Sequence, residues 1–171
     1  MNEPTEYYTY TTSPLGDILI AGTESGLTHI SFQEGSNALA PREGWVEDAS
    51  FLQEANDQLH AYFYGELTRF DIPLRPQGTE FQQRVWTALL TIPYGETVSY
   101  ARIAEQLGQP TATRAVASAN GQNPLPIVIP CHRVIGSDGK LRGYASGLEI
   151  KAELLALEQA NSSITGGQLL L

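Results

Sequence analysis

The chain has 171 residues but only one cysteine, Cys131, so it can form no disulfide within itself. A reducing compartment would keep such a lone thiol free. No apolar run approaches the ~18 residues that a membrane span needs, and residues 1–6 lack the basic and apolar regions of a signal peptide. With 42% hydrophobic and 17% charged residues, the composition is that of a globular protein. The sequence therefore predicts a cytoplasmic protein that makes no contact with a membrane.

Metal-binding side chains are scarce in the first half of the chain. This half has no cysteine, and its two histidines, His29 and His60, stand far apart in the sequence. A zinc site needs a cluster of such ligands at suitable spacing. We therefore expect no metal ion and no other cofactor.

Positive charge is also scarce in the first half, and this divides the chain electrostatically. Residues 1–75 hold twelve Asp and Glu against three Lys and Arg, and so carry the whole net charge of −9. Residues 76–171 hold seven of each. A neutral half with several arginines can bind a polyanion through a few phosphate contacts, with modest affinity and a shallow salt dependence. Any nucleic-acid surface is therefore expected in the second half.

The first half has the pattern of a small α/β domain. Residues 7–12, 17–21 and 27–32 are β-branched or aromatic runs between turn-rich segments, which predicts an antiparallel sheet. We expect a helix over residues 50–64, with Ser50 as its N-cap, and a further strand at residues 70–74. Prolines and a glycine then mark a boundary, which divides the chain into a scaffold domain at residues 1–76 and a second domain at residues 77–171.

The second half changes to short helices. Thr79 and Gln82 form the signature of a capping box, and Ser99 is placed to cap a second helix. A third helix is expected over residues 111–120. Two short helices joined by residues 108–110 predict a helix-turn-helix. The inner face of the third helix is expected to consist of Ala112, Ala115, Val116 and Ala119.

The outer face of that third helix carries one long cation, Arg114, beside the small residues Ala117, Ser118 and Gly121. A smooth face permits close approach to a sugar-phosphate wall or a minor groove, and Arg114 could then enter the base stack. The same small residues could instead pack against another helix and leave Arg114 as a solvated charge. From this face alone, the second interpretation is favoured.

The segment before Cys131 is aliphatic. Residues 126–129 predict a buried strand that Pro130 ends, which would place Cys131 at a strand end. His132 follows directly, but neighbours on an extended chain point to opposite sides, so adjacency does not establish a dyad. Glu158 falls within the apolar arc of a helix expected at residues 148–158. It could orient an imidazole there, or it could reach water if the helix end frays. Residues 161–171 remain unassigned.

These residues carry a family resemblance. The sequence Pro-Cys-His-Arg-Val at residues 130–134 resembles the active-site motif of the O6-alkylguanine-DNA alkyltransferases (methylated-DNA–protein-cysteine methyltransferases). Further segments resemble that family in order and spacing between residues 79 and 158. They are residues 93–100, 114–116, 123–124, 143–144 and 151–158. The resemblance implies a ribonuclease-H-like α/β N-terminal domain and a mostly helical C-terminal domain with a helix-turn-helix. It also implies a monomer that acts on double-stranded DNA.

The resemblance also implies a reaction. Cys131 would take the alkyl group from O6-alkylguanine, and also from O4-alkylthymine, once and irreversibly. His132 would take the thiol proton through a water, Glu158 would orient His132, and Tyr100 would donate a proton or hydrogen bond to the departing guanine. A free thiol of pKa ~8.5 is only a few per cent thiolate at neutral pH, so a nearby base helps.

Recognition of the lesion follows from the same resemblance. Arg114 would fill the gap that the flipped nucleotide leaves, Asn123 would tie the helix-turn-helix to the active-site strand, and the backbone N–H of Ala145 would donate to O6. The expected DNA-binding residues are Ser99, Thr111, Arg114, Ala115 and Ser118. The expected pocket residues are Asn123, Val134, Tyr144, Ala145 and Ser146. Small residues at positions 145–147 leave room for alkyl groups larger than methyl.

Two other functions fit part of the pattern. The first is a lesion-binding protein of the alkyltransferase-like type, which transfers nothing because its cysteine is replaced; Cys131 argues against it. The second is a cysteine hydrolase that uses Cys131, His132 and Glu158. Such an enzyme would turn over, and it would give the helix of Arg114 no role.

Overall fold

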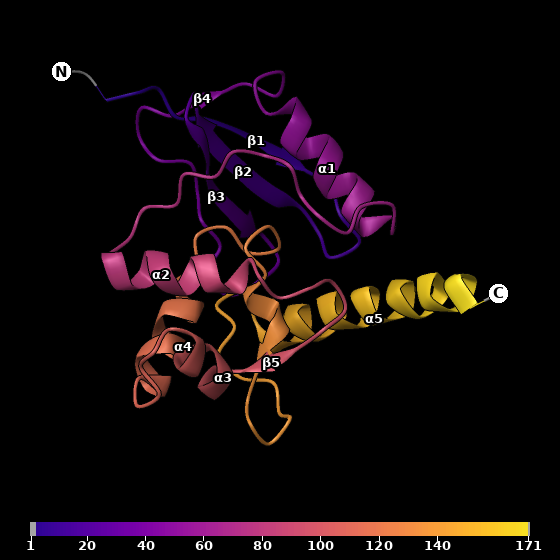
Figure 1. The fold of residues 1–171 in the computed structure, drawn as a ribbon. Coiled ribbons are helices and arrows are strands. Elements are labelled where there is room, and N and C mark those ends of the chain that lie inside the picture. Colours follow the sequence, from indigo (N-terminus) through magenta and orange to yellow (C-terminus); the bar gives the residue numbers. More distant parts are fainter. Residues whose placement is uncertain (1–2, 171) are drawn as a thin grey trace.

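A computed structural model describes the backbone of residues 3–170 and the side chains of residues 3–162. We call residues 3–76 the N-terminal unit and residues 77–170 the C-terminal unit. In Figure 1 the N-terminal unit, a sheet with one helix, lies above a C-terminal unit of short helices. The last helix, α5 (Leu148–Leu170), projects to one side of the body (Figure 1). Residues 161–170, which belong to the segment that the sequence left unassigned, continue this helix; residue 171 lies outside the described residues.

The N-terminal unit is built on a four-stranded sheet in the order β3-β2-β1-β4. Strands β1 (Tyr7–Thr11), β2 (Ile18–Thr23) and β3 (Gly26–Phe32) form an antiparallel meander, as predicted. A short strand, β4 (Val46–Glu47), adds to the free edge of β1 in parallel. The first five residues of β2 are all buried, so both faces of the central strand are covered.

Two predictions for this unit are wrong. Residues 70–74 form no strand; they contribute a single parallel bridge between Leu27 and Leu74. Pro73 has no N–H to donate, and proline interrupts a ladder for this reason. Helix α1 (Gln53–Phe63) begins three residues later than expected, and Ser50 does not cap it. The Asp48 carboxylate instead accepts the N–H of Phe51, which makes a turn of the approach to the helix.

The C-terminal unit contains α2 (Glu80–Leu89), α3 (Tyr100–Gln106) and α4 (Thr113–Gly121). The predicted capping box is present, because Thr79 Oγ1 accepts the N–H of Gln82 at 3.1 Å and Gln82 Oε1 accepts the N–H of Thr79 at 2.8 Å. Ser99 caps α3 as predicted. Between α4 and α5 lie a 3-10 turn, η1 (Cys131–Arg133), and the strand β6 (Val134–Ile135), which pairs in parallel with β5 (Val98–Ser99).

Helix α4 is shorter and turned differently from the prediction. It starts at Thr113, and its buried residues are Val116, Ala119 and Asn120. Ala115 is exposed, because it lies about 100° around the helix from Val116. The assignment of Ala115 to the inner face is therefore wrong. The indole N–H of Trp86 donates to the carbonyl of Ala119 at 2.9 Å and joins α2 to α4.

The two units share one hydrophobic core. A continuous cluster of buried side chains runs from β2 and α1 through α2 and α4 to Leu154 of α5. A backbone hydrogen bond from Ile30 to Pro124 at 2.9 Å joins the edge of β3 to the C-terminal unit. The position of each unit relative to the other is therefore fixed by packing as well as by the connecting chain.

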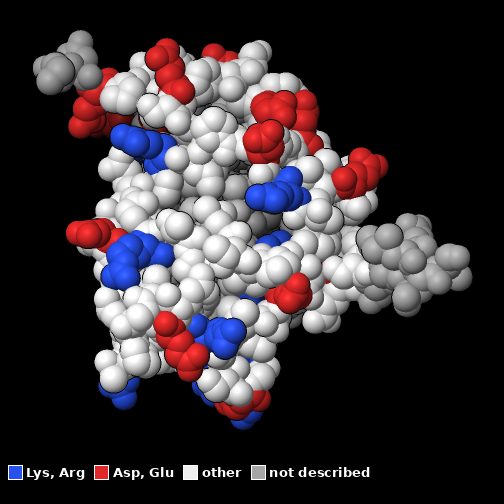
Figure 2. Space-filling model, viewed as in Figure 1, with Lys and Arg blue, Asp and Glu red and all other residues white. Residues whose placement is uncertain are grey.

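The charge division seen in the sequence is visible on the surface. Acidic side chains gather over the N-terminal unit in Figure 2, whereas basic and acidic side chains are mixed over the C-terminal unit. Within residues 3–170, no helix combines the length and the apolar character that crossing a membrane requires.

Candidate active site

Cys131 is the first residue of η1 and does not lie at the end of a strand. The preceding aliphatic residues are buried, but they form turns, and Ile127 has a positive φ of 77°. Prolines at positions 124, 126 and 130 remove the N–H donors that a strand needs. A β-branched residue at positive φ costs about 1–3 kcal/mol, so the surrounding packing must enforce this conformation. The prediction of a strand at residues 126–129 is thus wrong, although the burial was foreseen.

Two asparagines at the C-terminal end of α4 hold this segment. Asn123 Nδ2 donates to the carbonyl of Ile129 at 2.8 Å, and its Oδ1 accepts the N–H of Leu125 at 2.9 Å. Asn120 Nδ2 donates to the carbonyl of Cys131 at 3.3 Å. The C-terminal end of α4 and the cysteine are therefore parts of one hydrogen-bonded assembly.

The Cys131 thiol is free and only 3% exposed. Burial raises its pKa to about 11, although Asn123, Lys151 and Tyr144 act in the opposite direction. A thiol with this pKa is ionised in roughly one molecule in ten thousand at pH 7. The resting protein therefore holds a neutral thiol, and a reaction at sulfur needs a base to take the proton.

His132 is fully buried, and its Nε2 lies 2.6 Å from Glu158 Oε2. Because an ionised carboxylate can only accept a hydrogen bond, Nε2 carries the ring proton and Nδ1 presents its lone pair. Nδ1 has no hydrogen-bond partner among the described residues. Burial lowers the pKa of His132, with Glu158 acting in the opposite direction, so the imidazole is neutral at pH 7. The side chain is thus a base with one unengaged nitrogen.

Glu158 is also fully buried, and donors surround its carboxylate. Oε2 accepts from His132, from the Tyr62 hydroxyl at 2.6 Å and from Arg133 Nη2 at 3.1 Å. Oε1 accepts from Arg133 Nε at 2.8 Å and from the N–H of Gly95 at 3.2 Å. Burial alone would raise the pKa of Glu158, but the hydrogen bonds from His132 and Arg133 lower it to about 2. Of the two interpretations of Glu158, the structure supports the inward carboxylate and not the frayed end.

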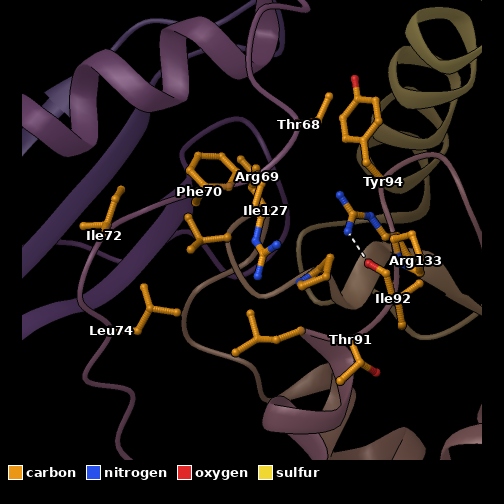
Figure 3. Close-up of a pocket in the computed structure, with 14 residues that line it drawn as sticks. Thr68, Arg69, Phe70, Ile72, Leu74, Thr91, Ile92, Tyr94, Ile127 and Arg133 are labelled. Atoms are coloured by element: carbon orange, nitrogen blue, oxygen red, sulfur yellow. Dashed lines mark hydrogen bonds between the residues drawn. The ribbon is translucent and has the colours of Figure 1, made fainter. Parts of the chain in front are cut away.

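A cleft of about 690 Å³ lies between the two units. Arg133 lies on its wall, and its Nη1 donates to the carbonyl of Ile92 at 2.7 Å (Figure 3). Cys131 and Tyr100 are not among the lining residues. Cys131 and Tyr100 therefore do not form the wall of this cleft.

A buried lysine, Lys151, interacts electrostatically with Cys131. Lys151 Nζ donates to the carbonyl of Arg142 at 2.6 Å and lies 3.5 Å from the hydroxyl of Tyr100, which donates to the same carbonyl at 2.9 Å. Burial lowers the pKa of Lys151 to about 8, and the charge of Cys131 acts in the opposite direction. Burial raises the pKa of Tyr100, so its hydroxyl keeps its proton. Tyr144 lies against the Cys131 sulfur, and burial raises its pKa well above the ordinary value.

The loop that carries Tyr144, Ala145 and Ser146 is attached to the N-terminal unit. Asn37 Nδ2 donates to the carbonyl of Ala145 at 3.2 Å, and the N–H of Ser36 donates to the carbonyl of Ser146 at 3.2 Å. The two segments approach so closely that a Cβ on residue 35 would lie 2.4 Å from the Ser146 oxygen. A segment of the N-terminal unit therefore sets the position of this loop.

The structure separates the predicted site residues into two sets. The first set is buried and consists of Tyr100, Asn123, His132, Val134, Tyr144 and Glu158. The second set lies on or beside α4 and is exposed at Thr111, Arg114, Ala115 and Ser118. Ser99 is half-buried and caps α3, while Ala145 is exposed and Ser146 half-buried on their loop.

Known proteins match this sequence over most of its length. The family model described as "6-O-methylguanine DNA methyltransferase, ribonuclease-like domain" matches residues 6–76, and that described as "6-O-methylguanine DNA methyltransferase, DNA binding domain" matches residues 80–160. The methylated-DNA–protein-cysteine methyltransferase of Methanosarcina acetivorans is 55% identical over 152 residues, which are 89% of this chain and 97% of that protein. The chain belongs to this methyltransferase family.

Solved structures of the methyltransferase family share the fold. The O6-methylguanine methyltransferase of Mycobacterium tuberculosis is 51% identical and superposes with a TM-score of 0.85 over 92% of this chain and 94% of that one. A structure of Mycobacterium tuberculosis OGT in complex with DNA is 52% identical, with a TM-score of 0.84 over 91% and 94%. The predicted fold class, a ribonuclease-like α/β domain followed by a helical DNA-binding domain, is confirmed.

Three residues in contact with the predicted site residues were not predicted from the sequence: Lys151, Arg133 and Tyr62. Lys151, Leu154, Leu155 and Glu158 follow the spacing i, i+3, i+4, i+7, so the pattern that placed Glu158 inward could also have found Lys151. Arg133 was quoted only as part of a motif. Tyr62 carried no signal beyond its place on the apolar stripe of its helix, because its partner lies 96 residues away.

Proposed function

We propose that this chain repairs double-stranded DNA by moving the alkyl group of O6-alkylguanine, and of O4-alkylthymine, to the sulfur of Cys131. The observation that carries the proposal is a buried neutral thiol at Cys131, followed in the chain by a buried imidazole that a buried carboxylate holds. Nδ1 of this imidazole has no hydrogen-bond partner among the described residues. The thioether product has no step that releases the alkyl group. Each molecule therefore acts once. We further propose that it acts as a monomer and without a cofactor.

In the proposed reaction, Nδ1 of His132 takes the thiol proton through a water while the sulfur attacks the alkyl carbon. The S–C bond forms as the C–O6 bond breaks, and the bonding electron pair stays on the guanine. Glu158 stabilises the imidazolium that results. The Lys151 cation near the sulfur stabilises the developing thiolate, because opposite charges interact strongly in a dry site.

Tyr100 is the proposed donor to the leaving guanine. Its hydroxyl is protonated and donates to the Arg142 carbonyl in this structure, so it must exchange that acceptor for the base. A hydrogen bond or proton given to the guanine offsets the charge that the leaving electron pair brings.

The exposed side of α4 is the proposed DNA contact. We assign Arg114 to the space that the flipped nucleotide leaves, since flipping costs a few kcal/mol that stacking of a guanidinium can offset. The other proposed DNA-binding residues are Ser99, Thr111, Ala115 and Ser118. Asn123, Val134, Tyr144, Ala145 and Ser146 form the proposed lesion pocket, with the N–H of Ala145 as donor to O6. The DNA complex of the relative from Mycobacterium tuberculosis supports a DNA partner.

We also propose that residues 1–76 serve as the scaffold domain and residues 77–171 as the DNA-binding and transfer domain. A cytoplasmic location fits this chemistry, because Cys131 must stay reduced to react.

The test is the intact mass of the protein after incubation with one equivalent of duplex DNA containing O6-methylguanine. We expect a gain of about 14 Da on Cys131, where a methyl group replaces the thiol hydrogen. The Cys131→Ser variant should gain no mass yet bind the same duplex. Binding of the wild-type chain without a mass gain would instead indicate a lesion-binding protein. Processing beyond one equivalent would indicate a hydrolase.

A further inference from the structure

We infer that Tyr62, on α1 of the N-terminal unit, is a positioning residue for proton removal from Cys131. Its hydroxyl fixes the Glu158 carboxylate and shares the charge of the oxygen that holds His132. This inference rests on the proposed function, because it concerns the base of the same transfer reaction.

The contact is short and buried. Tyr62 Oη lies 2.6 Å from Glu158 Oε2, and both residues are 0% exposed. The same oxygen receives the N–H of His132 at 2.6 Å. One carboxylate oxygen therefore connects a helix of the N-terminal unit to the imidazole of His132.

The ring of Tyr62 cannot readily turn away from this contact. Its centroid lies 5.3 Å from that of Phe63, 5.5 Å from that of Phe70 and 6.2 Å from that of Tyr94. Burial and the negative charge of Glu158 raise the pKa of Tyr62 well above its ordinary value, so the hydroxyl keeps its proton and donates. The donor is thus fixed before the reaction begins, as a positioning group must be.

A second donor on Oε2 changes the basicity of His132. While Tyr62 shares the charge of that oxygen, the carboxylate stabilises the imidazolium less than it would alone. Tyr62 therefore keeps the imidazole neutral, and available as a base, to lower pH. Without the hydroxyl, Glu158 still accepts from Arg133 and Gly95, but its charge acts more strongly on His132. The pKa of His132 should then rise.

The simpler explanation is that Tyr62 only fills the core and its hydroxyl bonds to the nearest acceptor. Tyr62→Phe distinguishes core filling from the positioning role, because it keeps the ring and removes only the hydroxyl donor. Tyr94→Phe is the matched control: it removes a hydroxyl from the same aromatic cluster, but that hydroxyl contacts Asn161 and not Glu158.

The experiment measures the second-order rate of alkyl transfer from duplex O6-methylguanine between about pH 5 and about pH 8. The midpoint of the rising limb should move to higher pH by about half a unit or more in Tyr62→Phe. It should stay in place in Tyr94→Phe. A purely structural role of Tyr62 would lower the melting temperature, or the rate at every pH, without moving the midpoint, and that result would overturn the inference.

A second substitution tests the direction in which the midpoint of the pH–rate profile moves, even if Tyr62→Phe folds poorly. Site-specific Tyr62→3-fluorotyrosine keeps the volume nearly unchanged and makes the hydroxyl a stronger donor, so the midpoint should move to lower pH. An unchanged midpoint in this variant would also overturn the inference. Failure of the proposed function would look different, because the wild-type protein itself would then gain no alkyl group.

Discussion

The two units of this protein differ in how much of their role can be recognised in the sequence. The C-terminal unit carries the motifs, the cysteine and an even balance of charge. The N-terminal unit has an acidic surface and no cysteine. Yet the N-terminal unit supplies a donor to Glu158 and, through Asn37, a contact that holds the loop of Ala145. A unit without catalytic motifs can therefore still determine the positions of side chains and loops in the other unit.

The largest expected effect concerns the buried ion pair between Arg133 and Glu158, whose carboxylate also accepts from Tyr62 of the N-terminal unit. Arg133→Ala should destabilise the fold by about 3–5 kcal/mol, because it leaves the Glu158 charge buried without its main partner. Arg102→Ala is the control, since Arg102 meets Glu105 at 4.0 Å on the surface, where such a pair contributes less than about 1 kcal/mol. Urea denaturation measures both. Similar losses in the two variants would show that Glu158 does not depend on Arg133.

The second effect concerns the exposed surface of the C-terminal unit. Arg114→Ala should slow transfer from duplex DNA about tenfold or more, because the flipped state loses its stacking partner. Transfer from a free base such as benzylguanine should change little, since nothing has to be flipped. Parallel rate measurements on the two substrates decide the matter. Equal losses on both would contradict the proposed role of Arg114.

The third effect is the pH dependence of transfer. The pKa of His132 is lowered from 6.5, so the rate should rise with pH through a midpoint below that value as the base loses its proton. The pKa of Lys151 is about 8, so the rate should fall above that pH as the cation is lost. In Lys151→Met, which keeps a long apolar stem, the upper limb should disappear. A rate that climbs steadily past pH 8 in the wild type would exclude this role of Lys151.

The smallest effect concerns the contact between Asn37 and the loop. Asn37 has a positive φ of 61°, which glycine adopts without strain, so Asn37→Gly removes the donor without disturbing the backbone. We expect transfer to slow about threefold, in keeping with the loss of one hydrogen bond. Amide exchange at Gly147 should become faster. The neighbouring Ala38→Gly variant should change neither quantity, and a change of equal size there would indicate a general loosening of the segment.

The sequence predicted those parts of the fold that depend on local patterns. The strands β1 to β3, the capping box at Thr79 and the cap at Ser99 are encoded by neighbouring residues, and all are present. The inward position of Glu158 also followed from helical spacing. An aliphatic run, in contrast, fits a strand or a buried turn equally well. The prolines at 124, 126 and 130 have no N–H to donate to a neighbouring strand. This shortage of donors favours the buried turn.

The site was predictable only in part, for a physical reason. Hydrogen-bond partners such as Tyr62 and Glu158, or Asn37 and Ala145, stand about a hundred residues apart, and no local pattern pairs them. Ala115 was placed inward because small apolar residues suit either face of a helix. Only the three-dimensional fold brings these donors and acceptors together.

The carboxylate of Glu158 also decides how the protein withstands acid. Its pKa falls from 4.5 in the free side chain to about 2 in the fold, so it contributes stability above pH 4.5 that is lost as the pH drops towards 2. Protonation of Glu158 would weaken its hydrogen bonds to His132 and to Tyr62 of α1 at the same time. Tolerance of acidity and competence for repair are thus tied to the same proton.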